Sequence, residues 1–143
     1  MPRPELQAMD AGLNQMRMKS TWEAVRKAGS RVLAEVAKQD YDEHSAFAIR
    51  LALEEGLNNA VKHGNKMDAS KEIVLDYDVT PQRVEIVITD EGEGFDPKAV
   101  PDPTLDENLT KPYGRGIMLM KAFVNRVEFS ERGNSVRLIK ERN

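Results

Sequence analysis

The chain has 143 residues, a length that fits one domain with a substantial core and leaves little room for two. Its 21 Lys and Arg against 24 Asp and Glu give a net charge of -3, which argues against a dedicated nucleic-acid binder. The lack of cysteine excludes disulfides, thiolate metal sites and cysteine nucleophiles, and the two histidines argue against a multi-histidine zinc site. No apolar run is long enough for a membrane span, and residues 1–5 lack a secretory segment, so we expect a cytoplasmic protein.

The N-terminal part predicts an arm, a strand and a first helix. Residues 1–13 contain two prolines and little periodicity, so we expect a flexible arm there. Residues 15–19 alternate weakly and predict a short edge strand. Ser20 or Thr21 then caps a helix. Its apolar residues recur at steps of three and four, with a glycine that indicates close packing: Trp22, Val25, Gly29, Val32 and Val36.

A second helix is predicted from residues 40–42 to about His63, with Gly64 as its end signal. Apolar residues surround it at helical spacing, so we expect it to be mostly buried; they are Phe47, Ile49, Leu51, Leu53, Leu57, Ala60 and Val61. Glu55 and Asn59 are four residues apart and therefore lie on the same side. On a buried helix such groups need a partner, and Mg²⁺ with phosphate oxygens would be one. The alternative is that both are exposed and bind nothing.

From residue 72 the apolar period changes to two, which predicts a β-hairpin with its turn at residues 80–82. The residues of its buried face are Ile73, Leu75, Tyr77, Val79, Val84, Ile86 and Ile88. Asp90 continues this phase. We therefore expect its carboxylate at the end of a strand, directed under the helical layer.

Residues 91–113 are rich in glycine, proline and acids and show little periodicity, which favours a lid or binding loop over a plain disordered connection. Residues 114–116 then open an apolar helix over residues 117–124. A strand begins near Val127, residues 132–134 form a hairpin signal, and Val136 and Leu138 lie in the returning strand. The predicted fold is α+β, an antiparallel or mixed sheet with helices on one face. Strand order cannot be deduced from this pattern.

Two glycine motifs are further candidates for ligand binding. Gly92 and Gly94 after Asp90 would let a flat ring approach the backbone, and the Asp90 carboxylate could accept a hydrogen bond from an amino group such as that of adenine. Gly114 and Gly116 at a helix start would offer backbone N–H groups to an anion, beside the positive charge of Arg115. The sequence contains neither a P-loop nor a dinucleotide-binding glycine motif.

The order and spacing of these motifs resemble a known superfamily. Glu55-x-x-x-Asn59-Ala60, Asp90-x-Gly92-x-Gly94 and Gly114-x-Gly116 look like the N, G1 and G2 boxes of the GHKL (Bergerat-fold) ATPases. Within that group the chain most resembles the anti-sigma-factor serine/threonine kinases of the RsbW and SpoIIAB type. The shared features are its length, the run Asn59-Ala60-x-x-His63-Gly64, and the run Gly114-Arg-Gly-Ile-x-Leu-Met120.

The resemblance covers nearly the whole chain from about Trp22. It implies a two-layer α/β sandwich over residues 1–143, a single histidine kinase-like ATPase domain with residues 95–113 as the ATP lid. That segment is proline-rich and acidic here and matches no lid motif that we recognise.

The resemblance also implies roles for individual residues. Glu55 would be the general base toward a serine or threonine hydroxyl, Asn59 would hold Mg²⁺, and Asp90 would bind the adenine amino group. The other nucleotide-binding residues that it implies are Lys62, His63, Gly92, Gly94, Gly114, Arg115, Gly116 and Ile117. His63 could equally pack on its own helix end, and Arg115 could stay solvated. Glu54 and Asn58 are expected to be solvated.

The implied function is an ATP- and Mg²⁺-dependent serine/threonine protein kinase that acts as an anti-sigma factor or partner-switching regulator. Its substrate would be a STAS-domain anti-anti-sigma protein, with a sigma factor as a second partner, a homodimer as the assembly, and no direct contact with nucleic acid or membrane. One alternative is an ATP-gated binding module without kinase activity. Another is a detached histidine-kinase domain, but His44 lacks the helical context of a phosphoacceptor.

Overall fold

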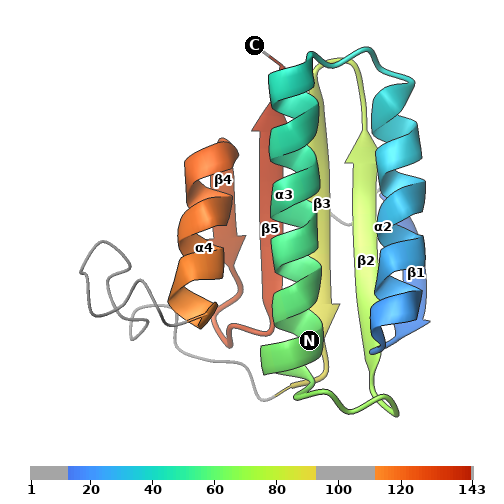
Figure 1. Cartoon of the computed structure of the whole chain (residues 1–143), viewed down its shortest axis with the longest axis vertical. Helices are drawn as coiled ribbons and strands as arrows, with labels where there is room; N and C mark the ends of the chain where they lie inside the picture. Colours follow the sequence, from blue (N-terminus) through green and yellow to red (C-terminus); the bar gives the residue numbers. More distant parts are fainter. Residues whose placement is uncertain (1–12, 93–111, 143) are drawn as a thin grey trace.

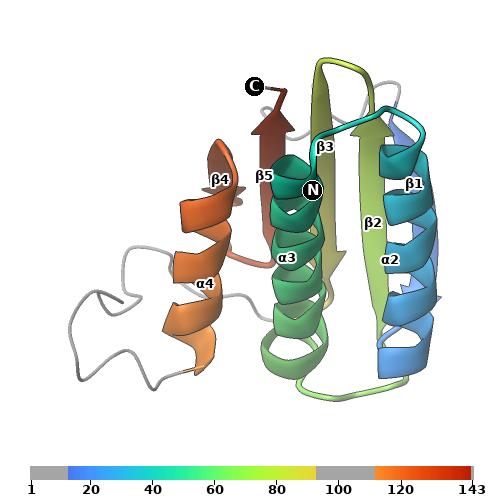
Figure 2. The same ribbon diagram turned by 45° about the horizontal axis from the view of Figure 1, so that its top comes forward.

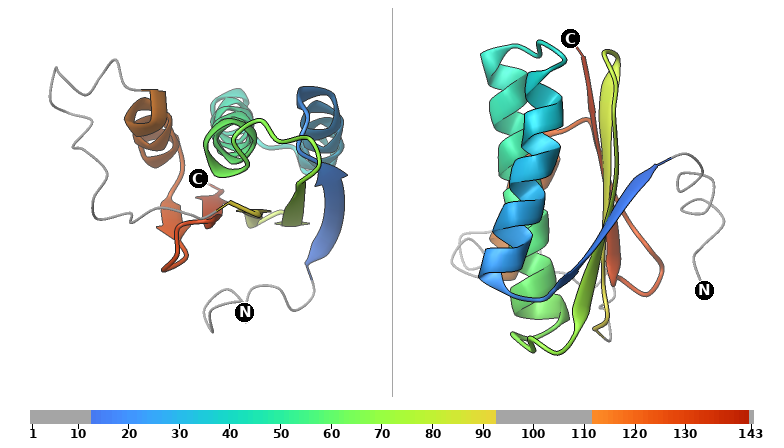
Figure 3. Two further views of the ribbon diagram at one scale, coloured as in Figure 1. Left: turned by 90° about the horizontal axis from the view of Figure 1, so that it is seen from below. Right: turned by 90° about the vertical axis from the view of Figure 1, so that its right-hand side faces the viewer.

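A computed structural model describes residues 13–92 and 112–142, with the backbone alone at residues 112–115, and arranges them in two layers (Figure 1). One layer is a sheet in which every neighbouring pair of strands is antiparallel. The other layer is a row of helices that lie side by side on one face of that sheet (Figures 2 and 3). This confirms the predicted α+β sandwich.

The bounds of the elements follow the sequence patterns closely. The strands are β1 (Asn14–Lys19), β2 (Glu72–Val79), β3 (Arg83–Asp90), β4 (Arg126–Phe129) and β5 (Ser135–Glu141). Their order across the sheet is β1-β2-β3-β5-β4. The helices are α2 (Trp22–Ala37), α3 (Glu43–Asn59) and α4 (Pro112–Phe123), and α3 continues into a π-helical turn, η1 (Ala60–Gly64). Within the described part of the chain, none of these helices combines the length and the apolar character needed to cross a membrane.

Side chains cap the first two helices where the sequence predicts. The Thr21 hydroxyl accepts a hydrogen bond from the Ala24 N–H at 3.2 Å, and the Asp42 carboxylate accepts one from the Ser45 N–H at 2.7 Å. Each cap satisfies a backbone donor that the first helical turn leaves unpaired. The apolar stripe of α2 then packs inward, with Val25, Gly29 and Val32 buried.

The last turn of the α3 segment is wider than an α-helix. The Asn65 N–H donates to the Ala60 carbonyl and the Met67 N–H to the Val61 carbonyl, both at 2.8 Å. The helical segment therefore ends at Gly64, as predicted, but its final five residues form η1. Such π-turns occur frequently at functional sites.

The expectation that α3 is mostly buried is wrong for one of its faces. Phe47 is 45% exposed, and Arg50, Glu54 and Asn58 on the same stripe are exposed as well. The helices form a single layer, so α3 has the sheet below it and helices beside it, while its outer face meets solvent (Figure 3). Apolar spacing alone did not reveal that Phe47 lies on this outer face.

The sheet register buries the residues that the alternation predicts. Ile88 of β3 pairs with Leu75 of β2 and with Val136 of β5, and all three are buried in the core. Asp90 continues the same alternation along β3, so its side chain lies on the face of the sheet that the helices cover. Strand order, which the sequence left open, places β5 between β3 and β4. This order brings the β4–β5 turn, where Gly133 has φ 83°, beside the end of β3.

Helix α4 begins earlier than predicted. It starts at Pro112, so Gly114 and Gly116 lie inside its first turns and not ahead of it. Proline is favoured at the first helical position because its fixed φ suits the helix and its missing N–H is not needed there. The apolar run that begins at Ile117 marks where the helix meets the core, and this point comes after the helix has started.

Candidate functional site

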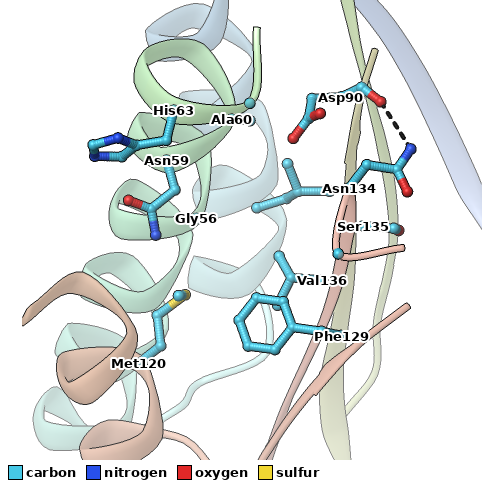
Figure 4. A pocket seen from close by; sticks show the side chains of 13 residues that line it. Gly56, Asn59, Ala60, His63, Asp90, Met120, Phe129, Asn134, Ser135 and Val136 are labelled. Carbon is cyan, nitrogen blue, oxygen red and sulfur yellow. Dashed lines mark hydrogen bonds between the residues drawn. The ribbon is translucent and has the colours of Figure 1, made fainter. Parts of the chain in front are cut away.

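Two adjoining hollows lie near the C-terminal end of α3, one against the sheet and one among the helices. The inner cavity, about 40 Å³, lies between α3, η1 and the sheet, with Met120 and Phe129 on its wall (Figure 4). The outer hollow, about 550 Å³, opens between the N-terminal end of α2, the C-terminal end of α3, and α4. Asn59 and His63 line both. The two spaces therefore adjoin at these two side chains.

Asp90 lies on the sheet side of the inner cavity, opposite Asn59 and His63 (Figure 4). Its Oδ1 accepts a hydrogen bond from the Gly92 N–H at 2.8 Å. Burial raises the pKa of Asp90 to about 6, and the Gly92 hydrogen bond and the charge of Arg132 only partly offset this. A half-buried carboxylate of this kind is suited to accept a further hydrogen bond from a ligand.

The β4–β5 turn fixes the backbone around Asp90. Asn134 Nδ2 donates to the Asp90 carbonyl at 3.2 Å, and the Asp90 N–H donates to the Asn134 carbonyl at 2.9 Å. Arg132 Nη2 donates to the Gly92 carbonyl at 3.1 Å. These contacts hold the strand end in place while its carboxylate faces the cavity.

The end of η1 approaches Asp90 so closely that only glycine fits. A Cβ on Gly64 would collide with the Asp90 carboxylate, and a Cβ on Gly92 would collide with the Gly64 carbonyl. We expected Gly92 to let a flat ring of a ligand approach the backbone. The group that approaches it is instead the carbonyl of Gly64 at the end of η1, and Gly92 lines neither hollow.

Glu55 and Asn59 converge with Gly116 at the outer hollow. A Cβ on Gly116 would lie 2.9 Å from Glu55 Oε2 and 3.3 Å from Asn59 Nδ2. Both polar side chains are half-buried and face the first turns of α4, so the alternative of two fully exposed groups is wrong. A carboxylate and a carboxamide thus face the same space.

Lys62 and His63 extend the polar wall of the outer hollow. Lys62 is exposed and His63 is half-buried, and both line this space. Burial lowers the pKa of His63, and the charge of Lys62 lowers it further, so its imidazole is neutral at pH 7. The cavity-lining interpretation of His63 therefore agrees with its position.

Some of the predicted residues lie elsewhere. Ile117 is 4% exposed and packs in the hydrophobic core, on neither hollow. Glu54 is exposed beside Arg50, at 3.8 Å, as expected for a solvated residue. Gly94, residues 95–111 of the expected lid, residues 1–12 of the expected arm, and the side chain of Arg115 lie outside the described residues.

Sequence reasoning missed the structural role of Asn65. This side chain is fully buried; its Nδ2 donates to the Glu72 carbonyl at 3.1 Å, and its Oδ1 accepts from the Glu91 N–H at 2.8 Å. Asn65 thereby connects the end of η1, the start of β2 and the residue after Asp90. An asparagine after a helix-ending glycine gave no signal of burial, because such residues are usually exposed caps.

The oxygen atoms of Glu55 and Asn59 suit a hard cation such as Mg²⁺ only if a ligand supplies further oxygen atoms. Among residues 13–92 and 112–142 there is no group of three or more His, Cys, Asp or Glu side chains placed to hold a metal ion. Asn59 and Glu55 offer oxygen atoms to the same hollow, and oxygen is the ligand that Mg²⁺ prefers. Mg²⁺ is usually bound by one or two protein oxygens together with phosphate oxygens. The residues present fit that arrangement.

Fold and site together define a nucleotide-binding domain of the GHKL type, and the family comparison agrees. The chain belongs to the histidine kinase-like ATPase domain family, whose sequence model matches residues 18–140. This match confirms the superfamily resemblance on which the expected ATP site rests.

Two relatives are similar to this chain at low sequence identity. The chain is 28% identical over 99 residues to the serine-protein kinase RsbW of Bacillus licheniformis, which covers 64% of this chain and 61% of the relative. It is 24% identical over 136 residues to the anti-sigma F factor of Clostridium perfringens, covering 88% of this chain and 94% of the relative. The chain thus spans about three fifths of that RsbW relative.

Among solved structures, the fold is similar to that of the RsbU and RsbW domains of a Mycobacterium tuberculosis protein. The TM-score is 0.59 at 16% sequence identity, over 91% of this chain and 32% of that chain. At this identity the likeness shows a shared fold. It supports the two-layer architecture independently of the motifs.

Proposed function

We propose that the chain is an ATP-dependent serine/threonine protein kinase that acts as a partner-switching regulator. The observation that carries this proposal is the convergence of Glu55 and Asn59 on Gly116, in a hollow that adjoins the cavity of Asp90. The names of the relatives, a serine-protein kinase and an anti-sigma factor, support the same class.

The inner cavity would receive the base of ATP. Asp90 would accept a hydrogen bond from the adenine amino group, and the apolar wall with Met120 and Phe129 would face the ring. A carboxylate held by backbone contacts discriminates well, because a ligand without the amino group leaves it unpaired. Asp90 therefore selects the base and takes no part in the transfer.

The outer hollow would receive the phosphates. Lys62 and the first turns of α4 border this space and would favour negative charge. Asn59 would hold Mg²⁺, which would neutralise charge on the phosphate oxygens when it is bound. The residues of the chain contribute mainly by positioning, which is what phosphoryl transfer requires.

Glu55 would act as the general base. Its carboxylate would accept the proton of a serine or threonine hydroxyl as the oxygen bonds to the γ-phosphorus, while the bond from that phosphorus to the bridging oxygen breaks and ADP leaves. Base catalysis of this kind typically contributes about 10²–10⁴-fold. The open side of the outer hollow is where a protein hydroxyl would enter.

The partners follow from the class and belong to the same proposal. The substrate would be a STAS-domain anti-anti-sigma protein, and a sigma factor would be the regulator that the chain sequesters. A homodimer would be the functional assembly, with edge strand β1 and helix α2 as candidate contact elements.

Incubation with γ-labelled ATP, Mg²⁺ and a STAS-domain protein tests this function. Acid-stable label on the STAS protein is expected, because phosphoserine and phosphothreonine survive acid. Nucleotide-dependent co-elution without label would replace the kinase by a nucleotide-gated binding module. Acid-labile label would indicate phosphohistidine and contradict the proposed acceptor.

A further inference from the structure

Large apolar side chains gather at the mouth of the outer hollow. Within the described ranges only three large hydrophobic residues are exposed: Trp22 at 39%, Phe47 at 45% and Met67 at 54%. Trp22 and Met67 line the same hollow as Glu55, whereas Phe47 lines none of the hollows described here. Exposed apolar groups beside reactive ones indicate a contact surface more often than scattered single residues do.

Met67 is held at this position by an unusual backbone. Lys66 and Met67 have φ of 50° and 63°, a left-handed conformation that is uncommon for residues other than glycine. The Met67 N–H donates to the Val61 carbonyl at 2.8 Å. Asn65, two residues before Met67, is fully buried. Strain of this kind persists where surrounding contacts impose it, often at ligand sites.

Trp22 stands at the junction of two surfaces. It is the first residue of α2, directly after the Thr21 cap, and it lines both the outer hollow and a groove of about 350 Å³ between α2 and α3. The apolar lining of that groove includes Val25, Leu33, Leu53 and Leu57, and the polar side chains of Arg26, Ser30, Glu54 and Asn58 also line it. Trp22 therefore connects a partly apolar groove between the two helices with the hollow that Glu55 faces.

We propose that Trp22 and Met67 form an apolar clamp for the protein substrate, holding a large aliphatic side chain next to the phosphoacceptor hydroxyl. The inference rests on the proposed kinase function. A hydroxyl that reaches Glu55 must enter through the hollow that these two side chains border, so its sequence neighbours contact them. An indole face and a flexible thioether together suit an aliphatic side chain of variable shape.

Steady-state kinetics with a STAS protein that the chain phosphorylates test the clamp. Trp22→Ala and Met67→Ala should each raise KM for the STAS protein about tenfold, as for buried interface anchors, with kcat and KM for ATP unchanged. Phe47→Ala is the matched control, since it also removes an exposed large apolar side chain, and it should leave all three constants unchanged.

Other results with these variants distinguish failure of the clamp from failure of the kinase function. Parental KM for the STAS protein in both variants would overturn the clamp while leaving the kinase proposal intact. A rise in KM for ATP instead would place Trp22 and Met67 against the nucleotide and also overturn the clamp. Failure of the parent chain to label any STAS protein would contradict the kinase function itself.

The substrate provides the complementary half of the test. Aliphatic-to-alanine replacement beside the phosphorylated residue should raise KM with the parent chain and have little further effect with the Trp22→Ala, Met67→Ala double variant. Additive effects would overturn the clamp. Trp22 is the single tryptophan of the chain, so its emission should shift when a tryptophan-free STAS protein binds, and an unchanged spectrum would contradict the contact.

Discussion

The inner cavity and the outer hollow share two wall residues but differ in almost every physical property. The inner cavity is small and bordered by core side chains, and the backbone around its carboxylate is fixed by Asn134 and Asn65. The outer hollow is more than ten times larger and is lined by exposed or half-buried polar groups, with two exposed apolar residues at its rim.

Under the proposed function, this difference would separate nucleotide recognition from phosphate transfer. A rigid, narrow cavity with one half-buried carboxylate can select a base, because mismatched polar groups there remain unpaired. A wide, open hollow can admit both phosphates and a second protein, since neither needs to be enclosed. Changes at the inner cavity should therefore alter nucleotide affinity, and changes at the outer hollow should alter transfer or substrate-protein affinity.

The largest effect is expected from the proposed base. Glu55→Ala should reduce phosphate transfer about 10²–10⁴-fold, because no other carboxylate lines the described part of the outer hollow. ATP affinity should change little. Single-turnover transfer with labelled ATP measures the first effect and equilibrium nucleotide binding the second. Glu54→Ala is the matched control, an exposed neighbour that should transfer at the parental rate. Equal rates for Glu55→Ala and the parent would remove the base assignment.

A smaller but still large effect is expected at the inner cavity. Asp90→Asn replaces a charged acceptor with an amide and should weaken ATP binding about 10–100-fold, the range for hydrogen bonds to charged groups. Transfer at saturating ATP should persist. Titration calorimetry with a non-hydrolysable ATP analogue gives the affinity. Asp78→Asn, on the opposite face of the neighbouring strand β2, should leave affinity unchanged. Parental affinity in Asp90→Asn would contradict the adenine contact.

Gly116→Ala tests how closely α4 must approach Glu55 and Asn59. Its methyl group would lie 2.9 Å from Glu55 Oε2, so it should displace the carboxylate and slow transfer about tenfold. Gly29→Ala is the control, because its methyl group meets Leu57 at an ordinary 3.5 Å. That variant should keep activity and gain about 0.5–1 kcal/mol of stability by chemical denaturation. Parental transfer in Gly116→Ala would show that the hollow is wider than the contacts indicate.

The smallest effect is a pH dependence of nucleotide affinity. Burial raises the pKa of Asp90 to about 6, so lowering the pH from 7.5 to 5.5 should protonate the carboxylate and weaken ATP binding about fourfold. The sign for stability is opposite: a raised pKa means that the free protein loses the Asp90 contribution as pH rises through about 6. Asp90→Asn should remove both dependences. A flat affinity profile in the parent would contradict this account.

Much of the fold could be predicted because local patterns dictate it. The period of two fixed β2 and β3 and placed Asp90 toward the helices, and the caps at Thr21 and Asp42 fixed two helix starts. The position of β5 between β3 and β4 could not be predicted, since strand order depends on long-range pairing.

Part of the site could also be predicted from local sequence patterns. Spacing put Glu55 and Asn59 on one side of α3, but only the tertiary arrangement shows that Gly116 meets them. The π-turn and the burial of Asn65 depend on contacts between η1, β2 and β3, which leave no periodic trace in the sequence. The exposure of Phe47 was missed because apolar spacing does not distinguish a single helical layer from a helix surrounded on all sides.

The most direct test of the central claim is a crystal structure of the chain with Mg²⁺ and a non-hydrolysable ATP analogue. The account predicts that the adenine amino group lies within hydrogen-bonding distance of Asp90 and that the metal and phosphates lie beside Asn59, with Glu55 facing the γ-phosphate. A nucleotide bound on another surface, or one whose base is remote from Asp90, would contradict it.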